Sequence, residues 1–182
     1  MSGGRLVIPV GADDHLSGAR DAPVVLVEYG DYECPYCGAA YPIVKKLQRE
    51  LGGTLALVFR NFPLSEAHPH AERAAEAAEA VGAQGKFWEM HDLLYEHQDA
   101  LDPSSLVDYA RTLGLDDARV SRELADGTWR PRVRGDFRGG VRSGVNGTPT
   151  FFVNGDRFDG DWTDERLFLR ALRDAAEHRS SV

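Results

Sequence analysis

The sequence predicts an α/β fold in which a mixed sheet is flanked by helices and a block of helices is inserted midway. Three observations predict this fold. Two β-prone segments with a helical pattern between them occupy the first third of the chain. Helical patterns then run from Ser65 to about Gly144, and a β-hairpin signal followed by a helix ends the chain. The expected order is therefore β-α-β, a helical block, and β-β-α.

The first unit begins with a short apolar strand. Residues Val24 to Tyr29 are mostly β-branched or apolar on both faces, which is typical of a buried central strand. Apolar residues then recur at helical spacing from Ala40 to Leu51, and Gly52-Gly53 is expected to end this helix. Thr54 to Arg60 forms the second expected strand. A β-α-β order implies parallel strands that are joined by a right-handed crossover.

The helical block and the end of the chain carry clear local signals. His70 to Val81 is rich in Ala and Glu, which favours a helix, and Phe87 to Tyr95 continues with an aromatic stripe. Asn154-Gly155 lies between two β-prone runs and predicts a hairpin with a type I′ turn, because both central residues of that turn need a positive φ. Thr163 is the predicted N-cap of the last helix.

Composition narrows the classes of function. The 182 residues include 21 Lys and Arg and 29 Asp and Glu, which gives a formal net charge of −8. This acidic balance argues against nucleic-acid binding, which needs a basic surface. No segment has the length and apolar character of a signal peptide or a membrane span. We therefore expect a cytoplasmic protein, although a chain whose signal segment had been removed would look the same and would be periplasmic or extracytoplasmic.

Cys34 and Cys37 are the two cysteines of the chain, and they lie where the first strand gives way to the first helix. A helix N-terminus stabilises a thiolate through its free N–H groups and its positive dipole end. Pro35 suits the first helical position, where its missing N–H costs nothing. Because the thiolate is the nucleophile, Cys34 is expected to attack a disulfide. Cys37 lies one turn later on the same face and can attack a mixed disulfide on Cys34.

Two structural roles for the cysteine pair compete with this redox role. The pair could be half of a zinc site, or two inert buried side chains. Zinc would need two further ligands, and none lies at a familiar spacing. His68 and His70 are close in sequence, but beside Pro69 they more simply indicate the entry to a helix. We therefore predict no metal site and favour the redox role.

The sequence resembles the thioredoxin superfamily and, more closely, its DsbA-like branch. Glu28 lies six residues before Cys34, where thioredoxin-like proteins carry a buried carboxylate, and Pro42 matches the proline within their first helix. Gly147-Thr148-Pro149 is similar to their cis-proline loop. The segments that resemble DsbA-like proteins are Val27–Cys37 (VEYGDYECPYC), Gly144–Gly155 (GVNGTPTFFVNG) and Gly85–Trp88 (GKFW).

The resemblance implies a thioredoxin fold with an inserted all-helical domain. Pro149 follows Cys34 by 115 positions (149 − 34). This distance is too long for a plain thioredoxin or glutaredoxin core but fits a core that is interrupted by helices. The implied organisation is a thioredoxin-like domain over residues 1–62 and 144–182 and a helical insertion domain over residues 63–143.

The resemblance also implies that the chain is an enzyme, a protein disulfide oxidoreductase. Cys34 would attack, Cys37 would resolve the mixed disulfide, and Glu28, with a pKa raised by burial, would relay a proton. No bound cofactor is expected, because the Cys34–Cys37 disulfide is itself the redox group. The expected partners are protein or peptide thiols and disulfides and an unidentified redox partner. The implied substrate-binding residues are Thr148, Pro149, Pro35 and Tyr36.

The residues around the two cysteines depart from the most oxidising DsbA-like proteins. Those proteins have Pro-His between the cysteines, whereas this chain has Pro-Tyr, so Cys34 lacks a cationic partner within the motif. We therefore expect a reduction potential below about −120 mV. Glu33 opposes thiolate formation by its like charge. The motif Cys-Pro-Tyr-Cys is also that of glutaredoxins, so a glutathione-linked glutaredoxin or transferase-like enzyme is one alternative, and a non-catalytic redox sensor or chaperone module is another.

Two features of the helical block have simple structural explanations. A basic run from Arg130 to Arg142 could steer acidic substrates, but a solvated helix face explains it more simply. The aromatic stripe around Trp88 is more typical of core packing than of a peptide groove. His91 is expected to be a hydrogen-bonded core residue rather than a catalytic one.

Overall fold

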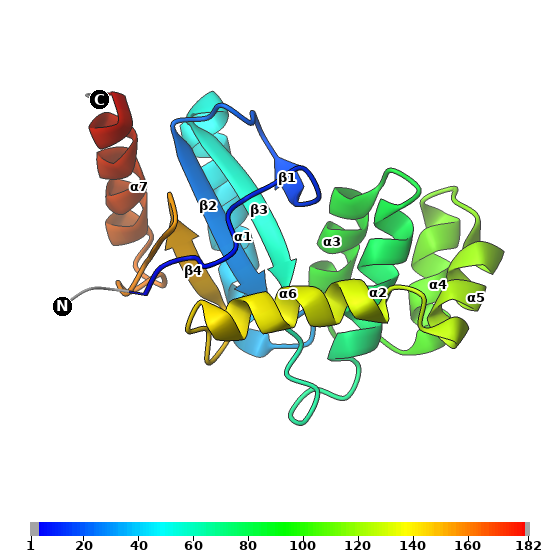
Figure 1. The fold of residues 1–182 in the computed structure, drawn as a ribbon. Helices are drawn as coiled ribbons and strands as arrows, with labels where there is room; N and C mark the ends of the chain where they lie inside the picture. Colours follow the sequence, from blue (N-terminus) through cyan, green and yellow to red (C-terminus); the bar gives the residue numbers. More distant parts are fainter. Residues whose placement is uncertain (1–3, 181–182) are drawn as a thin grey trace.

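The computed structural model describes residues 4–180, which build a five-stranded mixed sheet with helices on both faces (Figure 1). The strand order is β1-β3-β2-β4-β5. β2 and β3 are parallel, and the other pairs are antiparallel. This architecture confirms the predicted α/β fold. The strands are β1 (His15–Ser17), β2 (Val24–Gly30), β3 (Leu55–Asn61), β4 (Thr150–Val153) and β5 (Asp156–Arg157).

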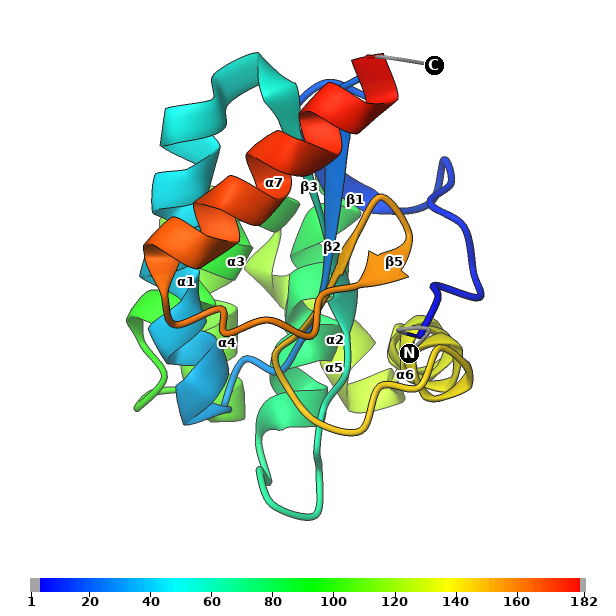
Figure 2. The ribbon, with the colours of Figure 1, turned by 90° about the vertical axis from the view of Figure 1, so that its left-hand side faces the viewer.

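Helices supply the remaining layers. Figure 2 shows α1 and α7 on one face of the sheet and α6 on the other, while α2 to α5 gather beside the sheet in Figure 1. No helix in the part of the chain that the structure describes is long and apolar enough to cross a bilayer. The helices are α1 (Pro35–Leu51), the short 3₁₀ helix η1 (Gly52–Thr54), α2 (Ala71–Gly82), α3 (Phe87–Glu96), α4 (Pro103–Thr112), α5 (Asp117–Asp126), α6 (Arg130–Arg142) and α7 (Glu165–Ser180).

The helices α2 to α6 form the inserted block between β3 and β4, as the sequence pattern indicates. The residue limits of the two domains, 1–62 with 144–182 and 63–143, remain a prediction. Residues 1–3 and 181–182 of the predicted thioredoxin-like domain lie outside the described residues.

The side chains of β2 alternate between the two faces of the sheet, and this alternation determines which of them lie beneath α1. Val24 and Leu26 pack in a buried cluster with apolar residues of α1 and α7, whereas Val27 and Tyr29 pack on the opposite face. Because successive side chains of a strand point to opposite faces, Glu28 lies on the same face as Leu26. The strand therefore places a buried carboxylate under α1, the helix that begins at the cysteine motif.

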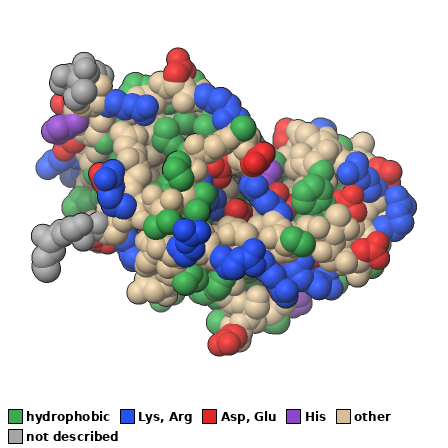
Figure 3. All heavy atoms as spheres, in the orientation of Figure 1, with side chains coloured by type: hydrophobic (Ala, Val, Ile, Leu, Met, Phe, Trp, Pro, Cys, Tyr) green, Lys and Arg blue, Asp and Glu red, His purple; other side chains and the backbone are tan. Residues whose placement is uncertain are grey.

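The basic run of the sequence lies on α6. Figure 3 shows Lys and Arg side chains in a row across the face where α6 runs. Arg130 and Arg134 lie 3.8 and 3.3 Å from the carboxylate of Glu72 in α2, and Arg132 lies 3.8 Å from that of Glu79. These three arginines therefore hold α6 against the acidic side of α2.

The last helix begins one residue later than the sequence predicts. Asp164, rather than Thr163, is the capping residue, because its carboxylate accepts the N–H groups of Arg166 and Leu167 at 3.0 and 3.1 Å. The Thr163 hydroxyl instead donates to Asp161 at 2.6 Å. Both residues are good N-caps, and the aspartate adds a charge that the helix dipole favours.

The sequence predicts the hairpin turn between β4 and β5 but not strand β1. The hairpin turn is confirmed, since Asn154 and Gly155 have φ values of 50° and 90°. Strand β1 was not predicted. It is three residues long and pairs with the outer edge of β3, so it offers too short a pattern for periodicity to detect.

Candidate active site

The first turn of α1 is built around the cysteine motif. Pro35 is the first helical residue, as predicted, and Cys34 is the N-cap with an extended backbone (φ −69°, ψ 123°). The N–H of Cys34 donates to the Asp31 carboxylate at 3.2 Å. The N–H groups of Tyr36 and Cys37 point toward the Cys34 sulfur and stabilise its thiolate. The helix end thus supplies the donors that the sequence predicts.

Cys34 is poised as a thiolate. The residue is 3% exposed, and both cysteines are free thiols. A hydrogen bond from the Cys37 thiol lowers the pKa of Cys34 to about 5, aided by Thr148 and opposed by burial. The ordinary value is about 8.5, so most Cys34 side chains are ionised at neutral pH. Low pKa is the property that a nucleophilic cysteine needs.

Cys37 has the opposite environment. It is fully buried, and its sulfur accepts the backbone N–H of Asp31 at 3.5 Å. Burial raises the pKa of Cys37 far above its ordinary value, and the hydrogen bond to Cys34 and the charge of Glu28 raise it further. Cys37 is therefore a protonated thiol that needs a base before it can attack.

Glu28 is the buried carboxylate beneath α1. Burial raises its pKa to about 8. Its Oε1 has no hydrogen-bond partner within residues 4–180. Glu28 also lines a cavity of about 410 Å³ between α1 and α3, beside an ion pair of 3.1 Å between Lys45 and Asp92. The carboxylate therefore lies between Cys37, whose pKa its charge raises, and a cavity that is lined by partly exposed charged groups.

The loop before β4 brings Thr148 against Cys34. The Thr148–Pro149 peptide bond is cis, and the Cys34 thiol donates to the Thr148 carbonyl at 3.6 Å. The buried Thr148 hydroxyl has no hydrogen-bond partner among the described residues, so it is free to donate to Cys34 when that residue is a thiolate. Figure 2 shows this loop, the start of α1 and the loop 62–70 at one end of the molecule.

The structure places the other predicted site residues on the surface around Cys34. Pro35 is exposed, Tyr36 is 69% exposed, and Pro149 is half-buried. His91 is a buried core residue that hydrogen-bonds the Tyr32 hydroxyl at 3.0 Å, as predicted. Within residues 4–180 there is no group of three or more His, Cys, Asp or Glu side chains arranged to hold a metal ion.

Sequence reasoning missed residues that hold the cysteine turn from a distance. Gln98, in the helical block, donates to the carbonyls of Tyr32 and Cys34 at 2.8 and 3.0 Å. His68 binds the Asp31 carboxylate at 2.7 Å. The His68-Pro69-His70 tripeptide does precede α2, as expected, but the sequence gives no sign of its contact with the turn. For Gln98 no signal in the sequence could have indicated the contact.

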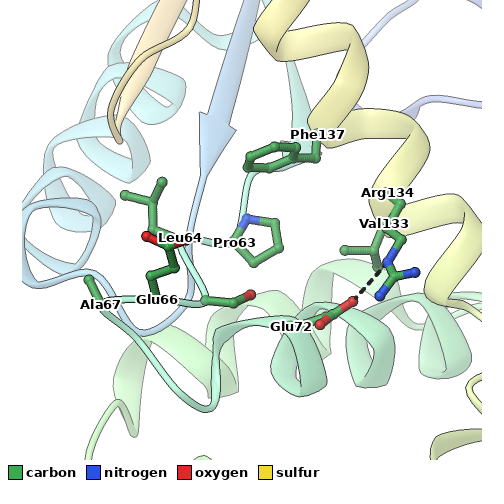
Figure 4. A pocket seen from close by; sticks show the side chains of 9 residues that line it. Pro63, Leu64, Glu66, Ala67, Glu72, Val133, Arg134 and Phe137 are labelled. Atoms are coloured by element: carbon green, nitrogen blue, oxygen red, sulfur yellow. Dashed lines mark hydrogen bonds and ion pairs between the residues drawn. The ribbon is translucent and has the colours of Figure 1, made fainter.

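A cavity of about 620 Å³ opens beside this turn, between the loop 62–70 and α6 (Figure 4). Its apolar wall comes from Pro63 and Leu64 of the loop and from Val133 and Phe137 of α6. Leu64 also connects the cavity to the cysteine turn, because its N–H donates to Asp31 at 2.9 Å. An apolar recess is therefore joined to the cysteine turn through Leu64, although no residue of the cysteine motif lines it.

The family model described as Thioredoxin matches residues 11–171 of the chain. The chain belongs to the thioredoxin family. Among solved structures, this thioredoxin-family chain is similar to oxidised BdbD from Bacillus subtilis, with 25% identity, a TM-score of 0.85 and coverage of 97% of this chain and 98% of that one. It is also similar to a thioredoxin-like oxidoreductase from Silicibacter pomeroyi, with 27% identity, a TM-score of 0.78 and coverage of 92% and 94%.

The structure of alpha-DsbA1 from Wolbachia pipientis, at 18% identity, shares the fold, with a TM-score of 0.82 and coverage of 97% and 96%. These matches confirm the predicted thioredoxin fold and its DsbA-like form. A curated relative, the Na(+)/H(+) antiporter NhaA 1 of Salinispora arenicola, is 51% identical over 163 residues, which are 89% of this chain and 25% of that protein. The chain thus spans about a quarter of the length of the curated relatives that it matches.

The low pKa of Cys34 predicts how its alkylation depends on pH. The rate of reaction of the reduced protein with iodoacetamide should rise with pH to a plateau, with its midpoint near pH 5, because only the thiolate reacts. Thr148→Val should move the midpoint upward, since it removes a donor to the thiolate. Mass spectrometry after timed quenching measures the rate. A midpoint above pH 8 in the unmodified protein would contradict the geometry described here.

Proposed function

We propose that this chain is a thiol–disulfide oxidoreductase that exchanges disulfides with protein or peptide substrates through Cys34 and Cys37. The proposal rests on two thiols that lie one helical turn apart and whose pKa values are shifted in opposite directions. Cys34 lies at a helix N-terminus and ionises readily, whereas Cys37 is fully buried, lies close to Glu28 and stays protonated. Such a pair suits a reaction in which one sulfur meets the substrate and the other resolves the adduct. The similarity to a thioredoxin-like oxidoreductase supports the proposal.

In the reducing direction, the Cys34 thiolate attacks one sulfur of a substrate disulfide. The Cys34–substrate bond forms, the substrate disulfide breaks, and the other substrate sulfur leaves as a thiolate. Cys37 then loses its proton and attacks the Cys34 sulfur, which releases the second substrate thiolate and closes the Cys34–Cys37 disulfide. The substrate gains two electrons and the cysteine pair loses two. The oxidising direction is the reverse, and neither direction needs a bound cofactor.

In this scheme, Glu28 accepts the proton that Cys37 loses. Its raised pKa means that the carboxyl is mostly protonated at pH 7, and an ionised fraction is present to accept the Cys37 proton. The cavity between α1 and α3 offers a route by which Glu28 returns the proton to solvent. Glu28 is therefore assigned as the proton relay for Cys37.

The substrate would lie across the surface formed by Pro35, Tyr36, Thr148 and Pro149. An extended peptide suits this place, since the cis-proline loop precedes a strand and presents its backbone beside Cys34. The recess lined by Leu64 and Phe137, which the hydrogen bond from Leu64 to Asp31 joins to the cysteine turn, suits an apolar substrate side chain. A reducing compartment would hold the pair as a dithiol that reduces substrates, whereas an oxidising compartment would hold it as a disulfide. A separate redox partner would return the Cys34–Cys37 pair to its starting oxidation state after each exchange.

Removing the resolving thiol tests the proposal directly. The Cys37→Ser variant, incubated with a synthetic peptide disulfide, should accumulate a covalent adduct of the protein with half of the peptide, because nothing attacks the mixed disulfide on Cys34. The unmodified protein should instead release reduced peptide. The matched control is the double variant Cys34→Ser, Cys37→Ser, which should form no adduct. Intact-mass measurement reads the result, and failure of Cys37→Ser to form an adduct would overturn the proposed function.

A carboxamide at position 28 tests the proton step. Ellman's reagent forms a mixed disulfide with Cys34 of the reduced protein and releases one thionitrobenzoate. The attack of Cys37 on this mixed disulfide releases a second thionitrobenzoate, so the second phase of release reports that attack. The rate of this phase should rise with pH through about 8, since Glu28 accepts a proton only when ionised. Glu28→Gln should slow the phase about 100-fold and remove the rise. Glu50→Gln, an exposed carboxylate at the far end of α1, is the control. An unchanged pH profile in Glu28→Gln would show that Glu28 does not carry the proton.

A further inference from the structure

Two tripeptides that are far apart in sequence pair with each other next to Cys34. One is Asp31-Tyr32-Glu33, directly before the cysteine, and the other is His68-Pro69-His70, directly before α2. His68 Nδ1 lies 2.7 Å from Asp31 Oδ2, and His70 Nδ1 lies 3.0 Å from Glu33 Oε1. The backbone N–H of His70 also donates to Glu33 at 2.6 Å. The mechanism proposed above uses neither histidine.

Asp31 connects the imidazole of His68 to both cysteines. One carboxylate oxygen accepts the backbone N–H groups of Glu33 and Cys34 at 2.8 and 3.2 Å. The other accepts the backbone N–H of Leu64 and the ring Nδ1–H of His68. The backbone N–H of Asp31 donates to the Cys37 sulfur. The Asp31 side chain is fully buried and that of His68 is 19% exposed. A single carboxylate therefore separates the imidazole from the backbone of the nucleophile.

The charges around His68 favour its imidazolium form. Burial lowers its pKa, but the hydrogen bond that the His68 ring donates to Asp31 and the negative charges of Asp31, Cys34 and Glu33 together outweigh burial and raise the pKa. Asp31 and Glu33 face it from the cysteine turn and Cys34 from the start of α1. On its own loop, His70 is engaged by Glu33. Without a positive charge at His68, the buried Asp31 carboxylate would oppose the Cys34 thiolate.

We propose that His68, positioned by Asp31, is the cationic partner of Cys34 that the Pro-Tyr dipeptide does not provide. A residue outside the cysteine motif thereby sets how strongly the thiolate is stabilised. This inference rests on the proposed function and adds a positioning residue to it. Because coupling between two sites is reciprocal, protonation of His68 favours the thiolate by the same factor by which the thiolate favours protonation of His68.

The reciprocity gives a test on the unmodified full chain. NMR titration of the His68 ring, assigned by the loss of its signal in His68→Gln, should give a higher pKa in the reduced protein than in the disulfide form, because the thiolate is present only in the reduced one. A purely structural contact with Asp31 would give the same pKa in both forms. Equal values would overturn the inference.

Matched histidine variants give the second readout. His68→Gln should lower the equilibrium constant for reduction of the Cys34–Cys37 disulfide by glutathione about tenfold, which corresponds to a potential about 30 mV more reducing. His70→Gln, whose pair with Glu33 is far more exposed, should change it less than about threefold. An unchanged constant in His68→Gln would overturn the inference while leaving the proposed function standing. An unmodified protein that exchanges no disulfide with glutathione would instead remove the proposed function itself.

Discussion

The position of Cys34 at the first turn of α1 is the constraint on which the rest of the site depends. The helix end supplies N–H groups to its sulfur, and the Asp31 carboxylate fixes the turn that leads into the helix. The inserted helical block then holds this turn from outside, because Gln98 binds the carbonyls of Tyr32 and Cys34. The insertion is therefore part of what fixes the geometry of the nucleophile.

The surroundings of the two thiols set their different chemistry. Cys34, 3% exposed, lies at the helix end beside Thr148, whereas Cys37 is fully buried near the buried Glu28. The chain has a net charge of −8, so its overall field does not favour a thiolate. The stabilisation of the Cys34 thiolate is local, and it comes from hydrogen bonds, from the first turn of a helix and, as proposed above, from the His68 imidazolium beside Asp31. The raised pKa of Glu28 is also a local effect, because its position in β2 buries the carboxyl group.

Local signals predicted most of the fold and the centre of the site. Cys34, Cys37 and the loop at Pro149 could be identified because each lies in a short motif, and the length between them indicated the inserted helices. The contact between Asp31 and His68 could not be predicted, because the two residues are far apart in sequence and the path of the loop 62–70 brings them together. The position of Glu33 next to Cys34 predicts that its charge opposes the thiolate, but in the folded chain the Glu33 carboxylate is paired with His70.

A reversible redox couple at Cys34 and Cys37 is the central claim, and equilibration with glutathione redox buffers tests it most directly. The fraction of protein with the Cys34–Cys37 disulfide, counted by alkylation and mass spectrometry, should follow a single two-electron transition. We expect a potential between that of thioredoxin, about −270 mV, and that of DsbA, about −120 mV. A pair that forms no disulfide with each other at any buffer ratio, or one with a potential below about −300 mV as in structural disulfides, would contradict the claim.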